Sequence, residues 1–175
     1  MRLDWRLPGR PASDRAADTA RMRHALPQWH RIAVPAFGAP FSGRSVRAAC
    51  RLAQMSDGKT DGCDVRLVYV IEVPRALSIA TELPGEEALA EQFLEQARQR
   101  AYLSGSTAMT DVLRGREAVE TLIRHVRQSE IDLLVLGSRT DEVRGLPISL
   151  TRQLLARAPC AVLLDHIGGE NAEED

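Results

Sequence analysis

The stretch Ile131-Asp132-Leu133-Leu134-Val135-Leu136-Gly137-Ser138 decides the fold of this chain. It is almost continuously apolar and ends on a glycine, a pattern typical of a parallel-sheet strand that is buried on both faces. A polar loop over 139–147 follows it, and then come a short helix over 149–158 and a second apolar strand introduced by Pro159. Four residues of the two strands are expected to be almost fully buried: Leu133, Val135, Val162 and Leu164.

Apolar periodicity elsewhere predicts strands that alternate with helices. The predicted elements are strands 30–35, 63–73 and 107–113 and helices 42–56, 84–103 and 117–128. The last helix has the clearest buried stripe, Val119, Leu122, Ile123 and Val126, and the stripe expected for helix 84–103 is Leu89, Phe93 and Ala97. The alternation predicts a single α/β domain, a doubly wound five-stranded parallel sheet with helices on both faces. The strand over 107–113 is polar and is expected at the edge.

The composition and the extent of the predicted elements indicate one folded domain, over residues 30–167. A chain of 175 residues with 44% hydrophobic content can bury a core of its own. Residues 1–29 carry six arginines and three aspartates without sustained periodicity, so a flexible extension is expected. Trp5 and Trp29 are exceptions within it, because large aromatic side chains in a tail often dock on the domain or on a partner. Residues 168–175 are expected to form a solvated acidic tail.

The charge balance and the absence of apolar runs exclude several classes of partner. The 23 basic and 24 acidic residues nearly cancel, so no global field indicates binding to nucleic acid or to a membrane. No apolar run approaches the roughly 18 residues of a transmembrane helix, and no signal-peptide core appears. A cytoplasmic protein is therefore expected.

No motif supports catalysis or metal binding. Cys50, Cys63 and Cys160 are isolated, which indicates small buried hydrophobes rather than a disulfide framework or a zinc site. The four histidines show no metal-ligand spacing, and a lone helical histidine such as His125 is typical of a surface or boundary position. Neither a nucleophile elbow nor an acid–base pair occurs. The chain is therefore not expected to be an enzyme.

The order of strand, Gly-Ser-Arg loop, short helix and Ala158-Pro159-Cys160 resembles the carboxyl-terminal signature of the universal stress protein family. That family's loop carries a glycine, two residues, a second glycine, nine residues, and then glycine followed by Ser or Thr. Gly137 matches the first glycine and Ser149 the Ser or Thr, but Thr140 and Ile148 replace the other two glycines, and the loop is two residues shorter. The resemblance spans about 31–166 and implies the strand order 3-2-1-4-5, with a homodimer formed through the edge strand 161–165.

The resemblance also implies an adenine-nucleotide site at the carboxyl ends of the strands, in eroded form. The family's first strand usually ends in an aspartate that helps to hold the nucleotide, and Phe37 stands there in this chain. Phe37 could stack on a base or fill the space that the base would occupy. Backbone amides near Ser149, with Arg139, Arg144 and Arg152, could bind an anion or form a solvated basic loop. The candidate site residues are Pro35, Phe37, Gly38, Val70, Leu136, Gly137, Arg139, Thr140, Ile148, Ser149 and Leu150.

The segment Gly38–Ser45 is a near match to a phosphate-binding P-loop. It follows a strand and opens a helix, as that motif requires. Arg44 replaces the motif's lysine, and Pro40 removes a phosphate-cradling amide. A P-loop nucleoside triphosphatase is the remote alternative.

Two functions from different classes remain for a family member of this kind. The preferred one is a nucleotide-independent regulatory module that acts on a still unknown protein partner. The other is an adenine-nucleotide-binding stress sensor. Phe37, Thr140 and Ile148 discriminate between them, since each replaces a residue type that the nucleotide mode uses. No cofactor is expected, and any ATP binding should be weak.

Overall fold

The structure is a computed structural model that describes residues 28–56, 62–139 and 146–167. For 138–139 and 166–167 only the backbone is described. Most of the predicted extension, the acidic tail, Thr140 and Arg144 lie outside the described residues.

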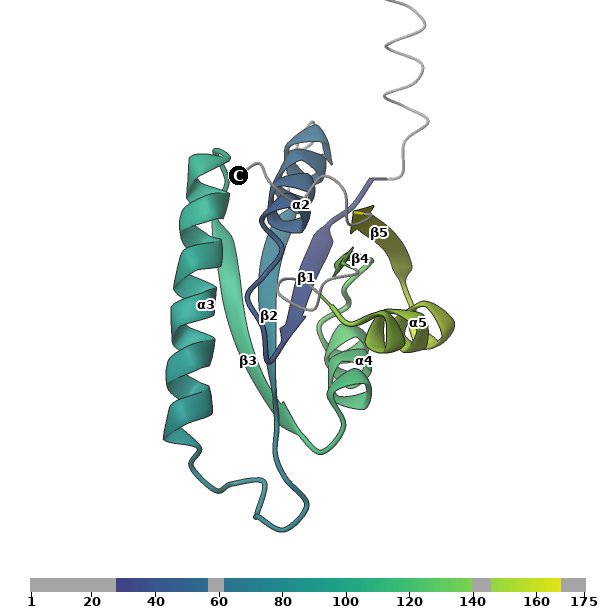
Figure 1. Ribbon diagram of the computed structural model, residues 1–175. Coiled ribbons are helices and arrows are strands. Elements are labelled where there is room, and N and C mark those ends of the chain that lie inside the picture. Colours follow the sequence, from purple (N-terminus) through teal and green to yellow (C-terminus); the bar gives the residue numbers. More distant parts are fainter. Residues whose placement is uncertain (1–27, 57–61, 140–145, 168–175) are drawn as a thin grey trace, which may run out of the picture.

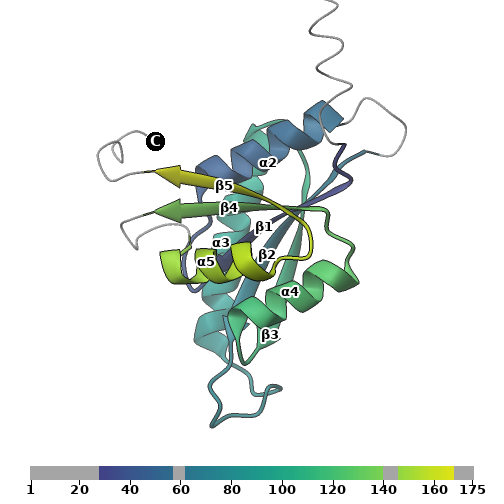
Figure 2. The same ribbon diagram turned by 90° about the vertical axis from the view of Figure 1, so that its right-hand side faces the viewer.

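Five parallel strands form one sheet in the order β3-β2-β1-β4-β5, with helices on both faces. The strands are β1 (Arg31–Phe37), β2 (Asp64–Glu72), β3 (Ala108–Gly115), β4 (Leu133–Arg139) and β5 (Ala161–Ile167). Helices α2 (Gly43–Ser56) and α3 (Pro84–Leu103) cover one face, and α4 (Ala118–Gln128) and α5 (Ile148–Arg157) cover the other (Figures 1 and 2). The predicted α/β fold, its strand order and the edge position of the third strand are confirmed.

Two apolar clusters, one on each face of the sheet, make up the core. Beneath α2 and α3, Tyr69 is fully buried between Phe41 and Phe93, with ring centroids 6.4 and 6.1 Å away. Leu133 and Val135 are buried on this side, as predicted. On the opposite face the predicted α4 stripe is confirmed, because all four of its residues are buried: Val119, Leu122, Ile123 and Val126.

Two burial predictions are wrong. Val162 is half-buried and Leu164 is 40% exposed, because β5 lies at the sheet edge and has a neighbouring strand on one side only. In α3, Leu89 is 42% exposed and Phe93 is only half-buried. The residues that α3 buries are mostly small, and small side chains allow a helix to approach its sheet closely: Ala90, Leu94, Ala97 and Ala101.

Strand β1 continues through Pro35, which the sequence placed at the strand end. The register with β2 runs unbroken from Arg31 to Phe37, whereas the register with β4 covers only Ile32 and Ala33. The backbone amide of Arg31 points toward β4, where it donates to Asp132 Oδ1 at 3.1 Å. Backbone groups alternate along a strand, so the nitrogen of Pro35 also points toward β4 and has no hydrogen to donate. Pairing between β1 and β4 therefore ends early, at the point where strand order reverses.

Helix α2 begins as predicted, with Ser42 as its N-cap. The Ser42 hydroxyl accepts a hydrogen bond from the Ser45 amide at 3.4 Å, and its carbonyl accepts one from Val46 at 3.1 Å. Such a cap satisfies amides that have no partner inside the helix. The cap fixes the amino end of α2 beside the carboxyl ends of β1 and β4.

Candidate functional site

The carboxyl ends of β1 and β4 form the usual ligand position of an open α/β sheet. Phe37 is the last residue of β1, and its half-buried ring packs against the apolar cluster beneath α4 and α5. Leu150 of α5 packs against the same cluster. Gly38 follows with φ +61°, a left-handed conformation that favours glycine. This placement favours the interpretation in which Phe37 fills space rather than presenting a face to a base.

Three candidate residues that precede the loops belong to the core. Pro35 is buried within β1, and Val70 and Leu136 are 2% and 0% exposed beneath α4 and α5. Their side chains support the floor of the site and are closed to a ligand in this arrangement. The Arg139 side chain and Thr140 lie outside the described residues.

Gly137 lies directly against the amino end of α2. A Cβ atom added there would meet Ser42 Cβ and Ser45 Oγ at 2.5 Å each, so only glycine permits this approach. The Gly137 carbonyl accepts a hydrogen bond from the Leu146 amide at 2.6 Å, and Leu146 is buried. The two ends of the loop after β4 are thereby held together. In this chain the first glycine of the motif therefore allows β4 to pack closely against the amino end of α2.

The near-match P-loop does not present its side chains for phosphate binding. Arg44 pairs with Asp165 of β5 at 3.4 Å. Ser45, which stands where the motif's metal-binding hydroxyl would be, is fully buried against Gly137. A P-loop needs the cation and the hydroxyl to point at phosphate and magnesium. This geometry argues against a P-loop nucleoside triphosphatase.

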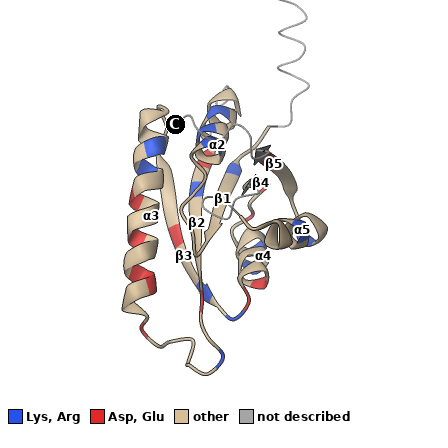
Figure 3. Ribbon diagram, viewed as in Figure 1, with Lys and Arg blue, Asp and Glu red and all other residues tan. Residues whose placement is uncertain are grey.

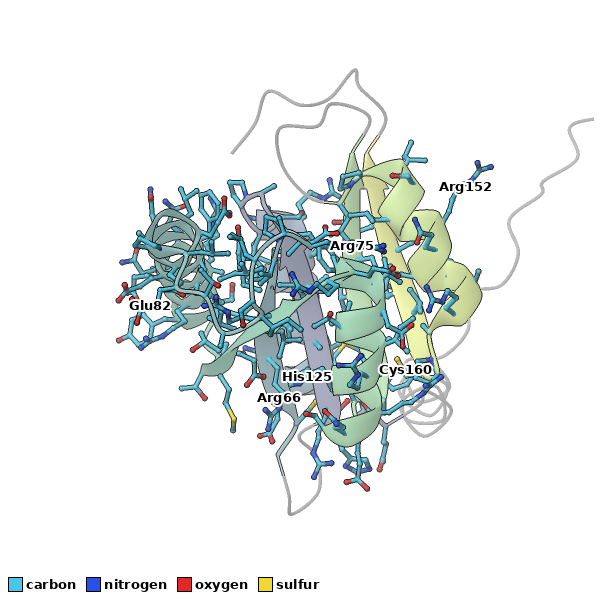
Figure 4. The ribbon with its side chains drawn as sticks, turned by 90° about the horizontal axis from the view of Figure 1, so that it is seen from below. Arg66, Arg75, Glu82, His125, Arg152 and Cys160 are labelled. Atoms are coloured by element: carbon cyan, nitrogen blue, oxygen red, sulfur yellow. The ribbon has the colours of Figure 1, made fainter. Side chains whose placement is uncertain are left out.

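The amino end of α5 is the more open part of the site. Ile148 is 48% exposed, Ser149 is exposed, and no side chain caps the first turn among the described residues. The Thr151 hydroxyl donates to the Pro147 carbonyl at 3.1 Å, a bond that engages a carbonyl of this turn and none of its leading amides. Arg152 points away from the sheet, so it does not add charge to this turn (Figure 4). An anion could still be held here by backbone amides alone.

Two arginines that the sequence did not single out hold the connector between β2 and α3. Arg116 donates to the carbonyls of Val73 and Leu77 at 3.2 and 2.5 Å. Arg114 pairs with Glu87 and donates to the Thr81 carbonyl. The sequence contains one signal for them. Arg114 and Arg116 flank Gly115 at the end of β3, next to the point where β2 leads into the long connector.

An acid–histidine contact that the sequence did not predict lies between β2, β3 and α4. Asp111 Oδ2 is 3.2 Å from Arg66 Nη1 and 3.4 Å from His125 Nε2, and Figure 4 shows Arg66 and His125 side by side. Ser129 Oγ is 3.5 Å from His125 Nδ1. Arg66 neutralises the carboxylate, and the serine lies at the carboxyl end of α4, where carbonyl dipoles oppose a developing oxyanion. The cluster therefore lacks what a serine hydrolase needs.

The described residues contain no group of three His, Cys, Asp or Glu side chains that could hold a metal ion. Burial raises the pKa of the Cys50 and Cys160 thiols, which keeps them protonated near neutral pH. Within the described part of the chain, no helix is long and apolar enough to cross a membrane.

Comparison with known proteins shows the family and the fold. The model of the universal stress protein family matches residues 28–166. A universal stress protein structure from Archaeoglobus fulgidus has 17% identity and a TM-score of 0.60, covering 78% of this chain and 93% of that one. The universal stress protein from Archaeoglobus fulgidus in complex with dAMP has 16% identity and a TM-score of 0.59, covering 79% and 98%. An Arabidopsis thaliana family protein with AMP bound has 13% identity and a TM-score of 0.56, covering 83% and 97%.

A search of curated proteins found no match. At the identities above, the solved structures establish the fold alone. The family model, however, spans most of the sequence. The chain belongs to the universal stress protein family.

Proposed function

We propose that this protein is a cytoplasmic regulatory module of its family that acts through protein contacts and holds ATP weakly or not at all. The observation that carries the proposal is the packing of Phe37 against the α4–α5 cluster, at the position of the family's nucleotide-binding carboxylate. Ile148, in place of a glycine, begins α5. No disulfide joins Cys50, Cys63 and Cys160, which suits a reducing compartment.

The second candidate is an adenine-nucleotide sensor. Two structural neighbours were solved with dAMP and AMP. The exposed Ser149 and the uncapped first turn of α5 offer a place for phosphate in this chain. In that case Phe37 would have to swing out of the apolar cluster and stack on the base.

ATP is expected to bind the purified protein with a dissociation constant no tighter than roughly 100 μM. Loss of a charged hydrogen-bond acceptor at position 37 removes about 1.5–3 kcal/mol, which is about one to two decades of affinity. Thr140 and Ile148 replace two glycines of the family's loop, and this is expected to remove further backbone amides that would bind the phosphates. Calorimetric titration of the wild type with ATP measures this directly.

The matched variant combines Phe37→Asp with Thr140→Gly and Ile148→Gly, which restores the family's residue types. We expect the triple variant to bind ATP at least about tenfold more tightly than the wild type. Tight wild-type binding, or ATP that survives purification, would contradict the proposal and favour the sensor.

We further propose a homodimer that forms through β5. Leu163 and Leu164 are each 40% exposed on this edge strand. The Ala161 amide bonds Asp132 on the β4 side at 3.2 Å, so by alternation the Val162 amide points outward. Exposed apolar edges are a liability that proteins cover, and a twofold mate is a common cover.

Val162→Pro removes that outward amide while leaving the bonds to β4 in place. It is expected to weaken the dimer by about 1–3 kcal/mol, since twofold symmetry deletes the hydrogen bond twice. Sedimentation velocity measures the change. Val162→Thr keeps the amide and should remain dimeric. A wild type that is monomeric at micromolar concentration, or a folded Val162→Pro with unchanged assembly, would refute this interface.

A further inference from the structure

A groove runs along the open edge of β3, on the side of the sheet away from β5. Two adjoining hollows of about 680 and 440 Å³ share Glu95 and Arg98 of α3 in their walls. The floor is formed by β3 residues whose side chains face α3, among them Ala108, Thr110 and Val112. Volumes of this size are typical of binding sites in proteins.

The backbone of β3 is open along this groove. The Gly115 carbonyl accepts the Val73 amide at 2.8 Å, so Gly115 faces the β2 side. Because backbone groups alternate along a strand, Thr110 and Val112 direct their N–H and C=O groups away from β2. Rows of this kind are the usual template for an added strand.

The lining of the groove is apolar on the floor and acidic on the wall. Val112 is 49% exposed, and Tyr102 and Leu103 are 78% and 83% exposed. Figure 3 shows acidic residues along the amino-terminal part of α3. Glu87 pairs with Arg114 and Glu95 with Arg98, while Glu91 has no ion-pair partner among the described residues. The floor of the groove thus fits the apolar side of an extended segment.

The chain itself contains such a segment. Residues 2–7, Arg-Leu-Asp-Trp-Arg-Leu, alternate over this short run, with Leu3, Trp5 and Leu7 on one side and Arg2, Asp4 and Arg6 on the other. Strict alternation over six residues is typical of a half-buried strand. Pro8 follows, and it has no N–H with which to continue a ladder.

The geometry of the chain allows this segment to reach the groove. The described part begins at Gln28, just before β1, and the position beyond β3 is three strand spacings from β1, about 14 Å. The intervening residues 8–27 can span up to about 66 Å when extended. A tether of this kind gives an effective concentration on the order of millimolar. Even an affinity of about 1 mM would keep half of the molecules docked.

We propose that residues 2–7 dock on the outer edge of β3 as a sixth strand, with Trp5 in the groove over Val112. The segment covers the exposed apolar residues of the groove with Leu3, Trp5 and Leu7, and its alternation places Arg2, Asp4 and Arg6 on the opposite, solvent-facing side of the added strand. The amino-terminal extension is on this account an intramolecular cover for the β3 edge, and this role does not depend on whether the protein binds ATP.

The test uses the full-length chain with Trp29→Phe, which leaves Trp5 as the sole tryptophan. Docking predicts a blue-shifted Trp5 emission and slower acrylamide quenching than in a free peptide of residues 1–10. It also predicts slow hydrogen exchange at the Thr110 and Val112 amides, which becomes fast when Trp5→Ser is introduced. Quenching equal to that of the free peptide, or fast exchange at both amides in the wild type, would overturn the proposal.

Variants of Val112 test the pairing with the β3 edge. Val112→Pro removes an outward amide and should lower docking about fivefold or more. Val112→Thr keeps the amide and should dock more tightly than Val112→Pro. Equal Trp5 quenching in the two folded variants, or quenching that varies with protein concentration, would contradict intramolecular docking.

Discussion

Replacing Val135 with aspartate is expected to abolish soluble expression of the protein. Val135 is 0% exposed in β4, within an apolar cluster that α2 and α3 cover. A carboxylate there would be buried without water, and its desolvation is expected to cost at least about 4–5 kcal/mol. Domains of this size are stable by only about 5–15 kcal/mol, so little or no folded protein should remain. Soluble yield and the thermal melting temperature measure the effect.

Met109→Asp is the control, because it also introduces a carboxylate on a strand of the same sheet. Met109 is 50% exposed and lies outside the groove, so a carboxylate there stays hydrated and is expected to change stability by less than about 1 kcal/mol. Wild-type melting of Val135→Asp would contradict the assignment of β4 as a fully buried strand.

Gly115→Ala is expected to destabilise the domain by about 2–3 kcal/mol, the cost of overpacking a close contact. An added Cβ would lie 1.8 Å from Thr121 Oγ1 and 2.9 Å from Thr121 Cβ. The Thr121 hydroxyl cannot rotate away freely, since it donates to the Glu117 carbonyl at 2.8 Å. Either β3 or α4 must shift to admit the methyl group. Urea unfolding monitored by circular dichroism gives the change in free energy.

Two further variants make the cause explicit. Gly85→Ala adds the same methyl group where no atom lies within 4 Å, and it should leave stability unchanged or slightly higher. Adding Thr121→Ala to Gly115→Ala removes the nearest atom, Thr121 Oγ1, together with Cγ2, and should recover about 1–2 kcal/mol as a coupling energy. A Gly115→Ala variant as stable as Gly85→Ala would show that β3 and α4 are not in the close contact described.

The sequence predicts the elements of this fold well where burial is two-sided or strongly periodic. The run from Ile131 and the α4 stripe are of this kind, and both are confirmed. The buried face of helix α3 is harder to predict. Its large residues Leu89 and Phe93 suggest one face, whereas the mostly small residues that are buried lie on another. The sheet selects the small stripe through close packing, which no local pattern reveals. The strand order came from the family resemblance, since periodicity alone cannot order parallel strands.

The sequence predicts where the candidate site lies, but it does not predict which residues are in contact there. Its place at the carboxyl ends of β1 and β4 follows from the topology of an open sheet. The contacts that shape it join residues distant in sequence: Gly137 with Ser45, Arg44 with Asp165, and Arg116 with Leu77. A linear pattern names such residues, but only folding brings them together. The prediction that Val162 and Leu164 are buried was wrong because it depends on the place of β5 in the sheet. An edge strand has one strand neighbour fewer than a central one.

The proline inside β1 has a consequence for how the domain opens. Backbone pairing between β1 and β4 covers only Ile32 and Ala33, while the other three strand pairs extend over whole strands. Parting the sheet at this seam therefore breaks fewer ladder hydrogen bonds than parting it anywhere else. Local unfolding follows such boundaries, in cooperative units that match supersecondary motifs. The domain is in this sense two ribbons, β3-β2-β1 and β4-β5, hinged at Pro35, and the side chains across the seam hold them together more than the backbone does.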